Sequence, residues 1–107
     1  MKIKKFLLIN LVIFTINTQS LLADDDKMAK GLEIFNETAG CAACHILKAA
    51  GSEGNVGPNL DTVSLTEELV REMVTHGLGV MPAYGEGILT KEEIDIVSFY
   101  VANSAGK

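Results

Sequence analysis

The sequence predicts a small all-α domain with about three main helices. Apolar residues recur at helical spacing in three stretches, over 26–38, over 67–76 and from residue 90 onward. No stretch shows the two-residue alternation of a half-buried strand. Once an N-terminal leader over 1–23 is set aside, residues 24–107 are enough for one domain and too few for two. A chain this short has little apolar surface to bury, so we expect an added covalent or metal constraint.

The leader has the pattern of a secretory signal peptide. Lys2, Lys4 and Lys5 form a basic start, an apolar run follows, and Ala23 offers a small residue at the cleavage point. The apolar run is about 11 residues long, whereas roughly 20 are needed to cross a bilayer. The alternative is an uncleaved anchor. We expect cleavage, export to the periplasm and no stable membrane insertion afterwards.

The first predicted helix covers residues 26–38. Its apolar stripe consists of Met28, Leu32, Phe35 and Ala39. The acidic run 24–26 is expected to supply a cap and a favourable charge at the helix start. Gly31 lies mid-helix, where glycine costs roughly 1 kcal/mol relative to alanine. A close crossing with another helix would explain this glycine.

The middle helix is predicted over 67–76. Ser64 and Thr66 are both suitable as its N-cap, and the pattern does not choose between them. Gly77 is placed to end the helix, because glycine accepts the left-handed conformation common after a last turn.

The last helix begins at Thr90, where Thr90 and Glu93 have the spacing of a capping box. Leu89 and Ile94 flank this box as a hydrophobic staple. The apolar positions expected in the core are Ile94, Ile96, Val97, Tyr100 and Val101. The glycine-containing stretches 51–57 and 77–87 are expected to be loops.

Cys41-Ala42-Ala43-Cys44-His45 is the motif that carries chemistry. In a helical turn, positions i and i+3 share one side, so both sulfurs can face one flat ligand. This arrangement suits two thioether bonds to one edge of a porphyrin, with the adjacent histidine as an iron ligand. The motif predicts one haem c bound covalently through Cys41 and Cys44, with His45 on the iron.

Three other uses of the two cysteines fit less well. A thioredoxin-like redox pair expects a strand before it and a βαβ context, and the sequence shows neither. A zinc site needs about four ligands, and the chain has only two Cys and two His. A structural disulfide in an exported protein would leave His45 without a role.

The second axial ligand of the iron is sought by elimination. The candidates are His76, Met28, Met73 and Met81. Met81 lies in a glycine-flanked irregular stretch, where a thioether can point inward without following helix periodicity, and Pro82 favours an extended Met81. The other two methionines are expected to pack within helices. His76 remains as the alternative, and we expect Met81 to be the ligand.

The charge excludes some partners. The leader takes three of the nine basic residues and none of the fourteen acidic ones, which leaves a formal net charge of −8. This balance argues against nucleic acid or an anionic lipid surface as a partner. It permits steering toward a redox protein with a basic docking surface.

Taken together, these features resemble a class I cytochrome c. The matching segments are Gly31 with Phe35, the 41–45 motif, Gly57-Pro58-Asn59-Leu60, Met81-Pro82, and Tyr100-Val101. The resemblance implies a small cytochrome c fold in which the first and last helices cross. It also implies that the Pro58 carbonyl accepts a bond from the His45 ring, that Leu60 packs on the haem, and that Tyr84 lines the pocket or approaches a propionate.

A narrower resemblance concerns segments 39–48 and 54–61. They are similar to the haem subunit of some bacterial sulfite dehydrogenases and to free-standing carriers with the same loop. With His45 and Met81 on the iron, no position is open for substrate. The expected function is single-electron transfer between a redox donor and acceptor, without enzymatic activity of its own. The alternatives are a dedicated electron-transfer subunit, as in a sulfite dehydrogenase, or a five-coordinate haem enzyme or gas sensor.

Overall fold

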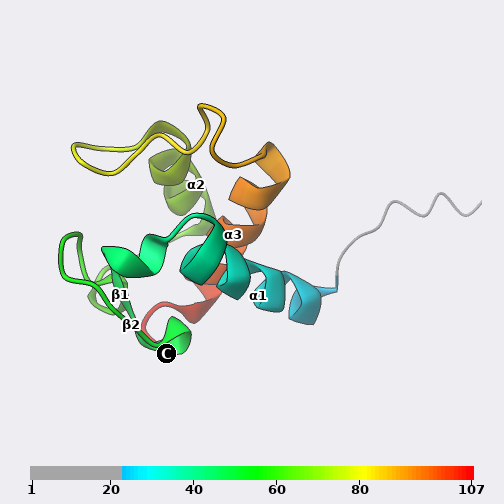
Figure 1. Cartoon of the computed structure of the whole chain (residues 1–107). Helices are drawn as coiled ribbons and strands as arrows, with labels where there is room; N and C mark the ends of the chain where they lie inside the picture. The colour runs from blue at the N-terminus through cyan, green and yellow to red at the C-terminus, as the bar shows by residue number, and fades with distance from the viewer. Residues whose placement is uncertain (1–22) are drawn as a thin grey trace, which may run out of the picture.

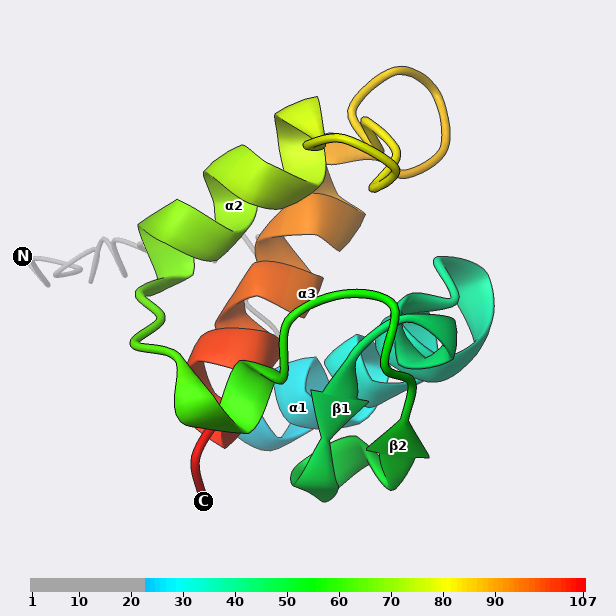
Figure 2. The same ribbon diagram turned by 90° about the vertical axis from the view of Figure 1, so that its left-hand side faces the viewer.

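Three α-helices carry the fold in the computed structural model, which describes residues 23–107. They are α1 (Asp24–Glu33), α2 (Glu67–His76) and α3 (Lys91–Ser104). Helix α3 is central, because α1 and α2 both pack against it (Figures 1 and 2). The predicted all-α class is confirmed, and residues 1–22 of the expected signal peptide lie outside the described part. Within residues 23–107, no helix has the length and apolar character needed to cross a membrane.

Helix α1 differs from its prediction in three details. It begins at Asp24, and Ala23 occupies the N-cap position without any side-chain bond, so the expected aspartate cap is wrong. The predicted last turn is π-helical (Ile34–Thr38), with Ala39 N–H donating to Ile34 O at 2.8 Å. Leu32 was expected in the apolar stripe but is exposed. The other three predicted members do face the core: Phe35 is buried, and Met28 and Ala39 pack against it while partly exposed. Gly31 and Ile34 are buried beside them.

Gly31 lies at the crossing of α1 and α3. A Cβ atom at this position would overlap Cβ and Cγ of Tyr100 and would lie 3.2 Å from the Ile96 carbonyl oxygen. The absent side chain therefore lets the two helices approach closely, as expected. Phe35 contributes to the same contact, with its ring centroid 6.0 Å from that of Tyr100.

The ends of α2 and α3 follow local sequence rules. The Thr66 hydroxyl accepts from Leu69 N–H at 3.1 Å, so Thr66 rather than Ser64 caps α2. Gly77 ends α2 with a φ of 68°. The predicted capping box of α3 is present, since the backbone N–H groups of Thr90 and Glu93 each donate to the other residue's side chain.

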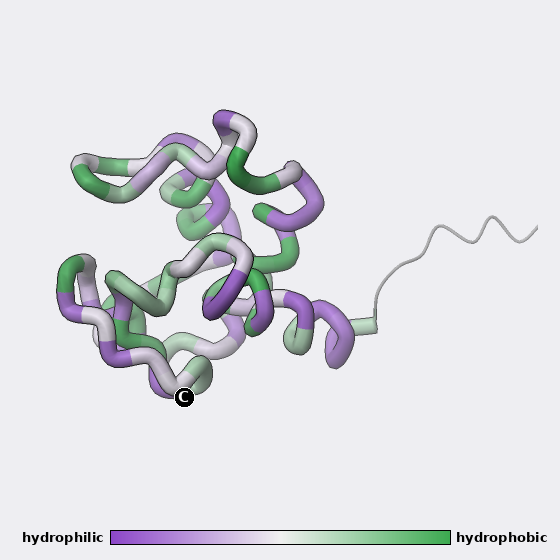
Figure 3. Tube along the Cα trace, in the orientation of Figure 1, coloured by the Kyte–Doolittle hydropathy of each residue, from purple (hydrophilic) through white to green (hydrophobic). Residues whose placement is uncertain are grey.

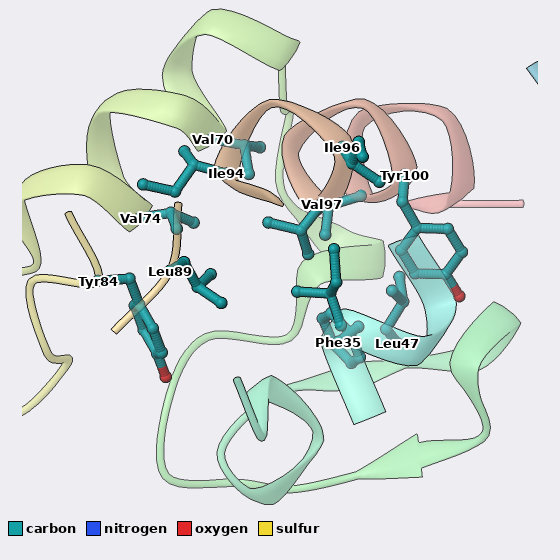
Figure 4. Close-up of a cluster of buried hydrophobic side chains, with 12 residues drawn as sticks. Phe35, Leu47, Val70, Val74, Tyr84, Leu89, Ile94, Ile96, Val97 and Tyr100 are labelled. Carbon is teal, nitrogen blue, oxygen red and sulfur yellow. The ribbon is translucent and has the colours of Figure 1, made fainter. Parts of the chain in front are cut away.

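One apolar core lies among the helices, and Figure 4 shows most of its side chains. Its buried members are Ile34, Phe35, Leu47, Val70, Val74, Tyr84, Leu89, Ile94, Ile96, Val97, Tyr100 and Val101. All five core positions predicted in α3 are among them. The core therefore draws on the helices and also on the segments that connect them.

A short antiparallel hairpin was not predicted. It pairs β1 (Ile46–Leu47) with β2 (Ser52–Glu53) in the register Ile46 with Glu53 and Leu47 with Ser52. Each strand has two residues, too few to show an alternating pattern. The Ser52 hydroxyl accepts from Leu47 N–H at 2.9 Å and reinforces the turn. The hairpin returns the chain toward the 41–45 motif.

Asp61 fastens the C-terminal end to the hairpin. One carboxylate oxygen accepts from Lys48 N–H at 2.8 Å and the other from Gly106 N–H at 2.9 Å. The Gly106 bond first, and then the Lys48 bond, lower the pKa of Asp61 because they stabilise its ionised form. Three distant segments are thus held by one side chain.

Candidate functional site

The four predicted site residues line one cavity. This cavity has a volume of about 460 Å³, within the usual range for cofactor pockets of roughly 300–1,000 Å³. Its walls are mainly apolar and come from α2, α3, the 41–45 motif and the loops around residues 56–65 and 78–84. Cys41, Cys44, His45 and Met81 all contribute to it. The fold therefore joins residues that lie up to 40 positions apart in the sequence.

The cysteine motif begins with a tight helical turn. Gly40 has a φ of 68°, and the residues Cys41–Ala43 after it form a 3₁₀ helix. The Cys41 carbonyl accepts from Cys44 N–H at 3.1 Å and from His45 N–H at 3.0 Å. Both cysteines and His45 consequently face the same cavity, as the helical interpretation of the motif predicted.

The His45 ring is fixed by the loop that follows the hairpin. Its Nδ1 lies 2.7 Å from the Pro58 carbonyl oxygen. A carbonyl only accepts, so Nδ1 carries the hydrogen and the other ring nitrogen, Nε2, keeps its lone pair for a metal. Gly57 lies against the ring, since a Cβ atom there would be 2.5 Å from His45 Cε1. The bond implied for Pro58 by the family resemblance is therefore present.

The same loop is tied to the cysteine turn. Gly57 N–H donates to the Cys44 carbonyl at 2.7 Å. Gly54 passes so close to the turn that a Cβ atom would lie 2.6 Å from the Ala43 carbonyl group. These two glycines bring Pro58 within reach of the histidine. The orientation of His45 thus depends on backbone contacts that only small residues permit.

Burial affects the free thiol of Cys41. Burial is the largest cause that raises the pKa of Cys41 to about 11, and nearby Cys44 acts in the same direction. The unreacted thiol is therefore neutral near pH 7. Its surroundings suit an apolar, bonded sulfur better than a reactive thiolate. This environment also disfavours the thioredoxin-like interpretation, in which a cysteine must ionise easily.

Met81 is held by the end of α2. Leu78 and Met81 exchange two backbone bonds, at 3.2 and 3.0 Å. Gly77 lies so close that a Cβ atom would be 2.5 Å from the Met81 carbonyl oxygen and 2.7 Å from the Pro82 carbonyl carbon. The loop is therefore defined by backbone contacts, and it places Met81 on the cavity wall.

The other three candidate ligands differ in whether they line the cavity. His76 is exposed, and its Nε2 lies 3.6 Å from a Glu72 carboxylate oxygen. Among the described residues that line the cavity, neither His76 nor Met28 appears. Met73 does line it, although we expected a packing role alone. The spacing of Leu69, Val70, Met73 and Val74 on one side of α2 is the sequence signal for this placement.

Tyr84 and Leu60 also line the cavity, as the resemblance implied. The Tyr84 hydroxyl donates to the Ala39 carbonyl at 3.1 Å. Burial first, and then the nearby Cys41 and Cys44, raise the pKa of Tyr84, so its hydroxyl stays a donor. The Ala39 bond has no sequence signal, because its partners are 45 residues apart.

Two apolar loop tips flank the cavity. Figure 3 shows hydrophobic tips on the 51–57 loop and on the loop after α2. Val56, Leu78 and Val80 are exposed by 66%, 70% and 88%, and all three contribute to the lining. Solvent-exposed apolar side chains at such a mouth are suited to contact the edge of a large flat ligand.

Known proteins resemble this chain in sequence and in fold. The family described as "Cytochrome C oxidase, cbb3-type, subunit III" matches residues 26–101. A cytochrome c6 from Picosynechococcus sp. is 34% identical over 95% of each chain. A cytochrome c6 from Leptolyngbya boryana is 36% identical over 74% of this chain and 94% of its own. The crystal structure of the c-type cytochrome SorU from Sinorhizobium meliloti aligns with a TM-score of 0.72 and 49% identity, over 78% of this chain and 95% of that one.

The chain therefore belongs to the c-type cytochromes. Within them it is a small class I electron carrier with a single haem, not an enzyme. Its cofactor is one covalent haem c, and Cys41 and Cys44 have the spacing that attachment needs. The cavity fits this group, because apolar walls surround two sulfurs, a histidine with a free Nε2 and a methionine.

Proposed function

We propose that the protein carries single electrons between redox partners in the periplasm through a haem iron ligated by His45 and Met81. The observation that carries this proposal is the convergence of Cys41, Cys44, His45 and Met81 on one apolar cavity. When bound, the haem supplies a one-electron Fe(II)/Fe(III) couple. Cys41 and Cys44 would attach the haem through their sulfurs, and His45 and Met81 would hold its iron.

The surroundings of the two ligands support this assignment. The Pro58 carbonyl orients His45 and makes its ring a stronger donor, as a carbonyl or carboxylate does for metal-bound histidines generally. The backbone pair between Leu78 and Met81 restrains the methionine loop. A methionine ligand favours the ferrous state and raises the potential. With His45 and Met81 both holding the iron, no position would be left for substrate, which disfavours a five-coordinate haem enzyme or gas sensor.

Two methionines on the same wall provide a direct test. Met81→Ala should remove the long-wavelength absorption band of a methionine–Fe(III) bond, lower the potential and allow carbon monoxide to bind Fe(II). Met73→Ala alters the same cavity in the middle of α2 and serves as the matched control, with the band retained. A band that survives in Met81→Ala, or that disappears only in Met73→Ala, would refute the assignment.

The covalent link has its own test. Replacing both Cys41 and Cys44 with alanine should give a chain from which acidified organic solvent extracts all pigment. The unmodified protein should keep its pigment under the same treatment. Haem that stays bound to the doubly substituted chain would refute attachment through these sulfurs.

The location and partners are proposed on the sequence. Export by the 1–23 leader predicts a mature protein that begins at Asp24, which intact mass determination of the periplasmic protein tests. The net charge of −8 after cleavage favours a partner with a basic docking surface, so transfer should slow as ionic strength rises.

A dedicated electron-transfer subunit is the second candidate. It rests on the resemblance of segments 39–48 and 54–61 to the haem subunit of some bacterial sulfite dehydrogenases. Isolation of the protein from its natural source distinguishes the two candidates. A stable complex with a metal-containing oxidoreductase indicates the subunit, whereas a free monomer that exchanges electrons with several proteins indicates the carrier.

A further inference from the structure

Tyr84 connects the two segments that carry the haem site. Its hydroxyl donates to the Ala39 carbonyl at 3.1 Å. Met81 precedes Tyr84 by three residues, and Cys41 follows Ala39 by two. Figure 4 shows the ring extending away from its own loop, with the hydroxyl at the far end. One hydrogen bond therefore joins the methionine loop to the cysteine turn.

The backbone of Tyr84 is fixed on both sides. Its N–H donates to the Val74 carbonyl near the end of α2 at 2.9 Å. Its own carbonyl accepts from Leu89 N–H at 2.9 Å, just before α3 begins. Because both backbone groups are bonded, the ring extends from a rigid base. The position of the hydroxyl is therefore coupled to the position of the methionine loop.

Within residues 23–107, the bond to Ala39 is the hydrogen bond that the Tyr84 hydroxyl makes. Tyr84 is 8% exposed and belongs to the apolar core, where a phenylalanine ring would fill the same space. This bond is partly buried, so it stabilises the arrangement that forms it, and its loss leaves the Ala39 carbonyl without this partner. The tyrosine oxygen therefore favours the conformation in which the methionine loop and the cysteine turn are close together.

We propose that Tyr84 is a positioning residue for the sixth iron ligand. Its bond to Ala39 holds the Met81 loop to the cysteine turn, so the hydroxyl would determine how often Met81 leaves the iron. This inference rests on the proposed ligation by Met81. An external ligand can bind only when Met81 is off, and its apparent affinity is proportional to the fraction of open molecules. Removal of the hydroxyl should raise that fraction.

The chain contains a matched control. Tyr100 is 3% exposed, and within residues 23–107 no hydrogen bond links its hydroxyl to the methionine loop or to the cysteine turn. Tyr100 lies at the crossing of α1 and α3. It is not among the described residues that line the cavity. Tyr100→Phe and Tyr84→Phe each remove one oxygen from a buried tyrosine. Only Tyr84→Phe removes a hydrogen bond between the methionine loop and the cysteine turn.

The experiment is an imidazole titration of the ferric holoprotein, followed by loss of the methionine–Fe(III) band. Tyr84→Phe should bind imidazole about three- to tenfold more tightly than the unmodified protein, because one net hydrogen bond is lost from the closed state only. Tyr100→Phe should match the unmodified protein. Equal affinities for all three proteins, or an equal increase in both variants, would overturn the inference.

A second readout separates positioning from general stability. On heating, the gap between the temperature at which the methionine band is lost and the temperature at which the helices unfold, measured by circular dichroism, should be wider in Tyr84→Phe than in the unmodified protein. A purely structural role would lower both temperatures together and would overturn the inference. If Met81→Ala keeps the band, the proposed ligation itself fails. If the band depends on Met81 but Tyr84→Phe behaves as unmodified protein, only the role of Tyr84 fails.

Discussion

Replacement of Gly31 by alanine should destabilise the protein although alanine is the better helix former. In an unhindered helix, the change would stabilise by about 1 kcal/mol. Here the new Cβ would overlap Tyr100 Cβ and Cγ and press on the Ile96 carbonyl oxygen at 3.2 Å. The Tyr100 Cβ atom cannot rotate away, because it is fixed to the backbone of α3. Helices α1 and α3 must therefore separate.

The size of the effect follows from these opposing contributions. Overpacking a close contact costs typically about 1–3 kcal/mol, and a clash with atoms fixed to a helix belongs at the upper end. The propensity gain offsets about 1 kcal/mol, which leaves a net loss of about 2 kcal/mol. For a domain of this size, we expect a fall in Tm of roughly 8–16 °C.

Thermal unfolding of the holoprotein by circular dichroism measures this change. Ala29→Gly on the exposed side of α1 is the control, because it alters propensity without touching α3 and should cost about 1 kcal/mol. A Tm for Gly31→Ala above that of the unmodified protein would refute the reasoning. Such a result would mean that propensity outweighs the helix crossing.

Two further predictions concern the orientation of His45 and the pH dependence of stability. Gly57→Ala places a Cβ 2.5 Å from His45 Cε1, so it should displace the ring from its carbonyl partner. The displaced ring should donate less to the iron, which raises the reduction potential measured in a potentiometric titration. An unchanged or lower potential would contradict this prediction. Asp61→Asn should lower stability most near neutral pH. The lowered pKa of Asp61 means that its contribution exists above the ordinary carboxyl range and is lost as pH falls through the folded-state value. Urea unfolding from pH 7 to pH 3 tests this, and a difference between the proteins that does not depend on pH would contradict it.

Sequence patterns predicted the local parts of the molecule. The capping box at Thr90 involves groups three residues apart, and Gly77 ends α2 through its own backbone conformation. The turn at Cys41 likewise depends on its immediate neighbours. Such features are readable because the partners are close in the chain. The missed hairpin has a physical cause too, because a strand of two residues has no period to detect.

By itself, the sequence determined that this chain is a small helical protein with a haem attachment turn and one histidine beside it. The tertiary structure decided which distant residues share the cavity with that turn. It placed Met73 and Met81 on the wall, kept His76 outside, and joined Tyr84 to Ala39 across 45 positions. The physical reason is the range of the interactions. Helix signals depend on neighbours three or four residues away, whereas the site depends on loops whose positions are fixed only when α1, α2 and α3 pack together.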